Sequence, residues 1–276
     1  MSFIEFLKAV LLGIIEGITE WLPISSTGHM IILDEFLKLN VSPEFKEMLL
    51  VVIQLGAIAA VPVMFWNRLN PFSKRKSESE RRATWSLWGK VVVGVMPAAI
   101  LGFLLDDFFE EHLYNYVVVS VALIVYGIAF ILVERIKKGR KYRIGDVSEL
   151  TYKDALLIGA FQTLSLIPGT SRSGSTILGG MISGVSRVAS AEFSFFMAIP
   201  VMLGASLLKV VKFLAEGFTA TSGEIGLLLV GIVVSFLVSV VVIKFLMDFV
   251  KRHNFSPFGV YRIILGAGVL IHFIAK

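Results

Sequence analysis

Long apolar segments constrain this chain most strongly, because several approach the about 20 residues that a helix needs to cross a bilayer. Six of them look complete, and they cover about 47–66, 86–105, 116–134, 191–211, 225–246 and 257–275. Hydrophobic residues make up 56% of the chain and charged residues only 17%, against about 45–50% and about 25% in soluble domains. The sequence therefore predicts an all-α integral membrane protein with six transmembrane helices.

Two further apolar segments are interrupted in the middle. The segment 3–40 is broken at "LPISSTG", and the segment 154–187 is broken at "IPGTSRSGS". Each half is too short to cross comfortably, and the Pro, Gly and hydroxyl residues free backbone groups that lipid cannot hydrogen-bond. Such backbone survives at membrane depth only where protein or a wet cavity surrounds it. We therefore predict two re-entrant helix–loop–helix segments, each entering and leaving on one side.

Charge in the connecting segments predicts the orientation. Residues 67–84 and 135–153 are rich in Lys and Arg and are expected in the cytoplasm, as are Lys251 and Arg252. Residues 106–115 hold four acidic residues without Lys or Arg and are expected outside. Both termini then lie outside, and the first interrupted segment enters from outside. This topogenic role accounts for the net charge of +5, so we expect no nucleic-acid partner.

Two pairs of similar stretches indicate an internal repeat. "GIIEGITEWLPISSTG" (13–28) resembles "GAFQTLSLIPGTSRSG" (159–174), and "EFKEMLLVVIQLGA" (44–57) resembles "EFSFFMAIPVMLGA" (192–205). Three crossings separate the copies, and an odd number inverts the second copy. In inverted-repeat membrane proteins, broken helices meet near the midplane and form the binding site. We therefore expect the two interrupted loops to face each other.

The repeat divides one membrane domain, 1–276, into two halves. Repeat 1 covers about 1–134 and repeat 2 about 154–276, and the basic cytoplasmic loop 135–153 joins them.

Two carboxylates lie within the first interrupted segment. Glu16 and Glu20 are four residues apart and therefore share one helix face. A carboxylate at the centre of a membrane helix costs about 2.5–3.5 kcal/mol on insertion scales. One interpretation is that the segment stays shallow and exposes both side chains at the interface. We favour a functional site in which they bind a divalent cation, Mg²⁺ or Ca²⁺, or act as a general base.

Hydroxyl residues and a histidine follow directly. Ser25, Ser26, Thr27 and His29 stand just after Pro23. Hydroxyls and free N–H groups at a helix start bind anions, and ordinary capping needs only one Ser. For His29 we favour acid–base or nucleophilic chemistry over a merely polar helix start.

The second interrupted segment carries the opposite charge. Arg172 is flanked by Ser171 and Ser173, and Gly174 frees the backbone. An Arg at membrane depth requires an anion, and its planar fork suits phosphate oxygens. The alternative is a structural salt bridge from Arg172 to Glu16 or Glu20.

The whole set suits phosphoryl chemistry on a lipid. Gln54 and Glu192 stand in apolar surroundings and rank second, either lining the cavity or bonding between helices.

Both motifs resemble those of a known family. "EGITEWLPISSTGH" (16–29) and "PGTSRSGST" (168–176) closely resemble the signature motifs of bacterial undecaprenyl-pyrophosphate phosphatases of the bacitracin-resistance type. The resemblance covers essentially the whole chain, including "QLGAI" (54–58). It implies hydrolysis of undecaprenyl diphosphate to undecaprenyl phosphate and inorganic phosphate, recycling of the peptidoglycan lipid carrier, and bacitracin resistance. It also implies divalent-cation dependence, an inner-membrane location, the inverted-repeat fold and an often dimeric state.

The chemistry of the residues and the resemblance together give the expected site. We expect catalytic roles for Glu16, Glu20, Ser26, His29 and Arg172, with Glu16 and Glu20 holding the cation. Substrate-binding roles are expected for Ser25, Thr27, Ser171, Ser173, Gly174 and Gln54.

The sequence leaves three candidates for the group that attacks phosphorus. Ser26 is the preferred nucleophile, activated by His29 or Glu20, and the alternatives are direct attack by His29 or by water. The orientation predicts hydrolysis on the outer, periplasmic side. The rival function is a transporter or flippase of polyprenyl phosphate lipids, because broken helices in inverted repeats are transporter architecture.

Overall fold

The computed structural model describes residues 2–275, apart from the side chains of Thr27, Ile31, Asp34, Glu35, Phe36, Asp106, Asp107 and Glu110. Within that part of the chain the secondary structure is helical, with twelve α-helices, two short 3-10 helices and no strand longer than the single bridge between Ile144 and Val185. The predicted all-α class is confirmed.

Six helical stretches are long and apolar enough to cross a membrane, as predicted. They are Pro43–Met64, Glu78–Leu105, Tyr116–Lys137, Arg187–Ala215, Ser222–Arg252 and Ser256–Ile274. The first consists of two helices, α3 (Pro43–Val52) and α4 (Gln54–Met64), that meet at Ile53. The others belong to α6 (Glu78–Leu113), α7 (Tyr116–Lys137), α10 (Arg187–Ala215), α11 (Ser222–Arg252) and α12 (Ser256–Ile274). The chain is a multi-pass membrane protein.

Helix α6 is longer than the predicted crossing at both ends. It begins at Glu78 because Ser77 forms a capping box, in which Ser77 Oγ accepts from Glu80 N–H and the Glu80 carboxylate accepts from Ser77 N–H. It continues to Leu113 because residues 103–113 contain neither Pro nor Gly. The expected loops 67–84 and 106–115 are therefore partly helical.

Both interrupted segments break close to the predicted places, but the second part of each predicted break, 26–28 and 172–175, already belongs to the following helix. Helix α1 (Phe3–Thr19) is separated from α2 (Ser26–Phe36) by residues 20–25. Helix α8 (Tyr152–Gln162) is followed by the 3-10 helix η2 (Thr163–Leu166), a loop, and α9 (Arg172–Ile182).

The last loop residue before each second helix has the same unusual conformation. Ser25 has φ 72° and Ser171 has φ 73°, and among the described residues these are the non-glycine positions with positive φ. Each serine caps the helix after it, because its hydroxyl accepts from the N–H three residues on, that of Gly28 or of Gly174. The two loops therefore reach their helices by the same turn.

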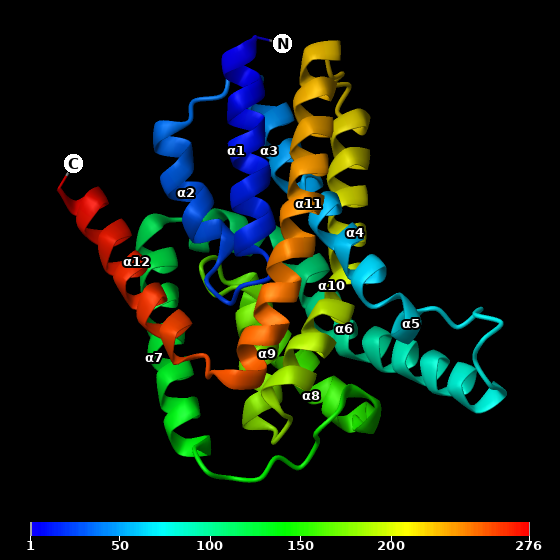
Figure 1. Cartoon of the computed structure of the whole chain (residues 1–276). Helices are drawn as coiled ribbons and strands as arrows, with labels where there is room; N and C mark the ends of the chain where they lie inside the picture. The colour runs from blue at the N-terminus through cyan, green and yellow to red at the C-terminus, as the bar shows by residue number, and fades with distance from the viewer. Residues whose placement is uncertain (1, 276) are drawn as a thin grey trace.

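Glycines let the interrupted segments pack closely on long helices. A Cβ on Gly13 of α1 would lie 2.8 Å from the carbonyl O of Gly231 in α11. One on Gly159 of α8 would lie 2.1 Å from the carbonyl O of Gly94 in α6. Small residues at such contacts are typical of membrane helices. Figure 1 shows α1 lying along α11.

The basic connections lie at the end of the molecule opposite the N-terminus (Figure 1). They include α5 (Trp66–Leu69) and the connection between α7 and α8. Arg68 forms an ion pair with Asp146 at 2.9 Å, and Arg143 pairs with Asp154. The hydrogen bond from Arg68 holds the pKa of the Asp146 carboxyl at about 2, below its ordinary 3.8.

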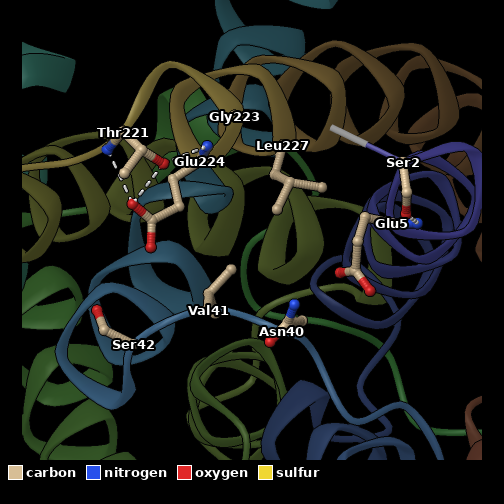
Figure 2. Close-up of a pocket in the computed structure, with 9 residues that line it drawn as sticks. All are labelled: Ser2, Glu5, Asn40, Val41, Ser42, Thr221, Gly223, Glu224 and Leu227. Carbon is tan, nitrogen blue, oxygen red and sulfur yellow. Dashed lines mark hydrogen bonds between the residues drawn. The ribbon is translucent and has the colours of Figure 1, made fainter.

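A polar pocket of about 470 Å³ lies at the N-terminal end, where α1, α3 and α11 begin (Figure 2). Ser2, Ser42 and Thr221, which line it, are the N-cap residues of these three helices. The Glu224 carboxylate accepts from the N–H and hydroxyl of Thr221. Helix capping explains these polar groups, and the pocket contains no residue of either motif.

Candidate active site

The two interrupted loops meet, as expected, through Arg172 and Glu20. Arg172 is the first residue of α9, and its Nη2 donates to Glu20 Oε1 at 2.8 Å. Ser173 Oγ donates to the Glu20 carbonyl O at 3.1 Å. Glu20 itself is fixed as the C-cap of α1, where its N–H donates to the Glu16 carbonyl. The salt bridge considered from sequence is therefore present in this structure.

Arg172 is held from a second side by α10. Its Nη1 donates to the Ser194 carbonyl O at 2.8 Å, and the Ser194 hydroxyl accepts from Thr176 at 2.7 Å. The Arg172 side chain is only 11% exposed, and its Nε has no partner among the described residues. The guanidinium is therefore buried and fixed in direction, and its Nε–H makes no hydrogen bond to the described residues.

Glu16 is the most buried carboxylate of the site. It is 1% exposed, and its Oε1 has no hydrogen-bond partner in the described part of the chain. It interacts electrostatically with Glu20 and Arg172. The interpretation in which both carboxylates sit exposed at the interface is wrong, because Glu20 is also buried. Two carboxylates thus lie close to one guanidinium.

Ser26 lies beside Glu20. It begins α2, and its Oγ donates to Glu20 Oε2 at 3.4 Å. Each oxygen of the Glu20 carboxylate therefore has its own partner: Oε1 accepts from Arg172 and Oε2 from Ser26. A proton leaving the serine hydroxyl has a nearby acceptor.

His29 is engaged elsewhere. Its Nδ1 lies 2.7 Å from the Ser25 carbonyl O, which only accepts, so we assign the proton to Nδ1. In the neutral ring, Nε2 then accepts from the Tyr261 hydroxyl at 2.7 Å, and the two rings stack 7° from parallel. Of the two activating groups considered for Ser26, the structure brings Glu20 to its hydroxyl and places both His29 nitrogens on other partners.

The remaining predicted binding residues form the starts of α2 and α9. Ser25 and Ser171 are the N-caps, and Ser171 Oγ lies 3.2 Å from Ser173 Oγ. Gly174 donates its N–H to Ser171. Such helix starts favour anions. The side chain of Thr27 lies outside the described residues.

Gln54 and Glu192, the two candidates ranked second, lie in different parts of the molecule. Gln54 begins α4 and is half-buried, and no described hydrogen bond joins it to the loops. Glu192 forms an ion pair with Arg68 at 3.0 Å, so it belongs to the basic end of the molecule.

Arg262 joins both loops and was missed from sequence. It lies in α12 with 0% exposure. Its Nη1 donates to the Pro23 carbonyl O at 3.1 Å, and its Nη2 donates to those of Gly169 and Thr170, each at 2.9 Å. The guanidinium also lies over the Tyr126 ring, 5.5 Å from its centroid. The available signal was a lone Arg inside an apolar crossing, which is a candidate functional residue by itself.

These observations define a class of protein: a multi-pass helical membrane protein whose two interrupted segments meet in a buried centre of arginine, carboxylate and hydroxyl groups. A family model described as "Bacitracin resistance protein BacA" matches residues 9–268. The chain belongs to this family.

Curated relatives match over nearly the full length. An undecaprenyl-diphosphatase of Enterococcus faecalis is 55% identical over 267 residues, covering 97% of each chain. One of Desulfitobacterium hafniense is 54% identical over 277 residues, covering 100% of this chain and 99% of its own. One of Acetivibrio thermocellus is 55% identical over 272 residues, covering 99% of each.

Proposed function

We propose that this chain is a membrane phosphatase that hydrolyses undecaprenyl diphosphate to undecaprenyl phosphate and inorganic phosphate. The activity recycles the lipid carrier of peptidoglycan synthesis and confers bacitracin resistance. The convergence of Arg172 and Ser26 on one carboxylate, Glu20, carries the proposal. A guanidinium, a hydroxyl and a carboxylate in contact are the groups that such a reaction needs to bind phosphate, attack it and accept a proton, and the names of the relatives suggest the substrate.

In the proposed reaction, the terminal phosphate binds to Arg172 and to the starts of α2 and α9. Ser26 Oγ attacks the terminal phosphorus while Glu20 accepts the hydroxyl proton, and the bond to the bridging oxygen breaks, releasing undecaprenyl phosphate. Water then cleaves the phosphoserine and releases inorganic phosphate. Attack by His29 is less favoured, because Nε2 is bonded to Tyr261.

A divalent cation, Mg²⁺ or Ca²⁺, fits this donor set. The unpartnered Oε1 of Glu16 and the neighbouring Glu20 carboxylate would hold it. The described residues contain no group of three or more His, Cys, Asp or Glu side chains suited to a metal. Two carboxylates alone suit a cation that also binds substrate phosphate and water, as Mg²⁺ does. Bound there, the cation would neutralise charge on the phosphate oxygens.

The proposal includes the inverted repeat and the re-entrant segments, with repeat 1 about 1–134 and repeat 2 about 154–276. The paired contacts support it: α1 packs on α11 as α8 packs on α6, through Gly13 with Gly231 and Gly159 with Gly94. Ser25 and Ser171 share one turn conformation. We place the basic end in the cytoplasm, so that the site opens outward. A homodimer is part of the proposal, to be checked by mass measurement in detergent.

Phosphate release by the purified protein in detergent tests the function. With undecaprenyl diphosphate and Mg²⁺ or Ca²⁺, wild-type protein should release phosphate, and a chelator should stop it. Arg172→Ala should lower kcat/KM by about 100-fold or more, with partial recovery in Arg172→Lys. If wild-type protein releases no phosphate with either Mg²⁺ or Ca²⁺ present, the enzyme proposal is wrong and the flippase function is favoured.

A further inference from the structure

A groove of about 640 Å³ lies between α6 and α10 beside the second interrupted segment. Its walls are apolar and include Val95, Ala98 and Gly102 of α6 and Val201, Gly204 and Ala205 of α10. A Cβ built on Gly204 meets no atom within 4 Å, so the groove is open at that point.

The two ends of the groove differ. One end is lined by Pro200 of α10 and by Gln162 and Ser165 of the interrupted segment. The other end is lined by Lys212, about 18 Å further along α10 at 1.5 Å per residue. In the orientation proposed above, Lys212 lies toward the outer surface and Gln162 near mid-depth.

The Gln162 side chain, at the mid-depth end of the groove, lacks hydrogen-bond partners. Its side chain is 1% exposed, and neither the amide nitrogen nor the amide oxygen has a partner among the described residues. A buried amide without a partner is costly, so something that enters the groove should offer a hydrogen-bonding group there. Gln162 is also followed directly by η2 and the loop that leads to Arg172.

The difference between the Lys212 end and the Gln162 end of the groove distinguishes between two kinds of lipid. An outer-leaflet phospholipid places its polar head at the Lys212 end and hydrocarbon at mid-depth. A lipid whose diphosphate binds at Arg172, ten residues after Gln162 on the same interrupted segment, would have its polar end toward Gln162 instead. We propose that the groove binds the isoprene units nearest the diphosphate, with the Gln162 amide toward the oxygen-bearing end of the lipid. This inference rests on the proposed function and assigns the residues that recognise the tail.

The length of the groove limits how much of the tail is recognised. The groove runs about 18 Å along α10 from Pro200 to Lys212. An isoprene unit adds four carbon–carbon bonds of about 1.5 Å each, or about 5 Å once the zigzag of the chain is allowed for, so the groove spans about four isoprene units. The rest of a longer chain leaves the groove into lipid past exposed rim residues such as Phe103 and Leu208.

Gly204→Phe tests the proposal, because it fills the groove where a side chain has room. The measurement is the variant to wild-type ratio of kcat/KM for prenyl diphosphates of one to four isoprene units. We expect the ratio to stay near one for the one-unit substrate and to fall about tenfold by four units, which corresponds to 1.4 kcal/mol. Gly204→Ala should have a small effect. Leu207→Phe is the matched control, because Leu207 is 66% exposed on the same helix outside the groove.

Three results would overturn the assignment. A ratio that does not depend on chain length would show that the lipid tail does not bind in the groove. An equal effect of Leu207→Phe would indicate bulk lipid, and a changed mass of the Gly204→Phe protein in detergent would indicate a second copy as the occupant.

Failure of the proposed function gives a different signature. Wild-type protein that hydrolyses none of these diphosphates would remove the enzyme proposal alone. Thermal stabilisation by the same series of lipids then decides the groove: stabilisation that rises up to four units in wild type and is lost in Gly204→Phe supports it, and unchanged stabilisation in the variant overturns it.

Gln162→Leu tests the inner end. It removes the amide at the oxygen-bearing end of the lipid, so we expect the same fall in kcat/KM for every chain length. A loss that appears only with longer tails would contradict the direction proposed for the lipid.

Discussion

At the scale of single residues, the site depends on how Glu20 divides its carboxylate between Arg172 and Ser26. One oxygen neutralises the guanidinium and the other lies 3.4 Å from the serine hydroxyl. His29 lies one helical turn beyond Ser25 and is tied to its carbonyl and to Tyr261. The two candidate bases, equivalent in the sequence, are therefore distinguished by geometry.

Glu20→Gln should accordingly reduce activity far more than His29→Asn. Removing the proton acceptor of Ser26 is expected to lower kcat about 10²–10⁴-fold, the range for a general base. His29→Asn should cost about tenfold or less, because it loses a helix-start contact and not the partner of Ser26. The measurement is kcat for phosphate release at saturating substrate.

Added cation provides the control for this prediction. Glu20 is proposed to hold the cation as well as to accept the proton, so full recovery of Glu20→Gln activity at high Mg²⁺ would assign the whole loss to cation binding and would contradict the role as base. A larger loss in His29→Asn than in Glu20→Gln would contradict the assignment of the base.

At the scale of elements, the six crossings and both breaks could be predicted because run length and Pro or Gly interruptions determine them. The junction of α3 and α4 at Ile53 has no such signal. The extension of α6 to Leu113 depends on the absence of Pro and Gly from residues 103–113, where the acidic residues instead suggest a loop. The contact of Arg172 with Glu20 was one of the stated alternatives. The role of Arg262 could not be predicted, because its partners are backbone carbonyls, which leave no pattern in a sequence.

Helix α12 should therefore be essential through Arg262. Arg262→Met leaves three buried carbonyls without their donor and should destabilise the protein by about 1–3 kcal/mol for each group that stays unpaired. Thermal unfolding and phosphate release in the same detergent measure both effects. Met keeps most of the side-chain volume, so packing loss stays small.

Arg262→Lys is the matched control. Lysine keeps the positive charge, but it lacks the planar fork of arginine and its single ammonium group cannot reach all three carbonyls. We therefore expect a stability between those of wild type and Arg262→Met. Wild-type stability and activity in Arg262→Met would show that the loops hold their positions without this residue.

At the scale of the whole molecule, ion pairs of arginine tie the connecting segments to one another. The basic connections gather at the end away from the N-terminus, and Arg68 ties α5 to both Asp146 and Glu192 there. Since the folded pKa of Asp146 is about 2 and its ordinary value is 3.8, the pair stabilises the fold above about pH 4. That contribution is lost as the pH falls through about 2.

Asp146→Asn should consequently lower the stability only modestly. The Asp146 side chain is 44% exposed, so solvent screening limits the loss to about 1 kcal/mol or less at pH 7. The difference in Tm between wild type and Asp146→Asn should shrink as the pH falls from 4 to 2. A difference that stays constant over this interval would assign the effect to packing and not to the ion pair.

The position of Arg262 has a consequence for biosynthesis. The loops that it joins are made early and midway through translation, whereas Arg262 arrives with the last helix of the described chain. Until α12 inserts, the carbonyls of Pro23, Gly169 and Thr170 lack the donor that fixes them. We therefore expect a nascent chain stalled before α12 to contain both motifs and yet lack activity, because the two loops are joined only after α12 has inserted.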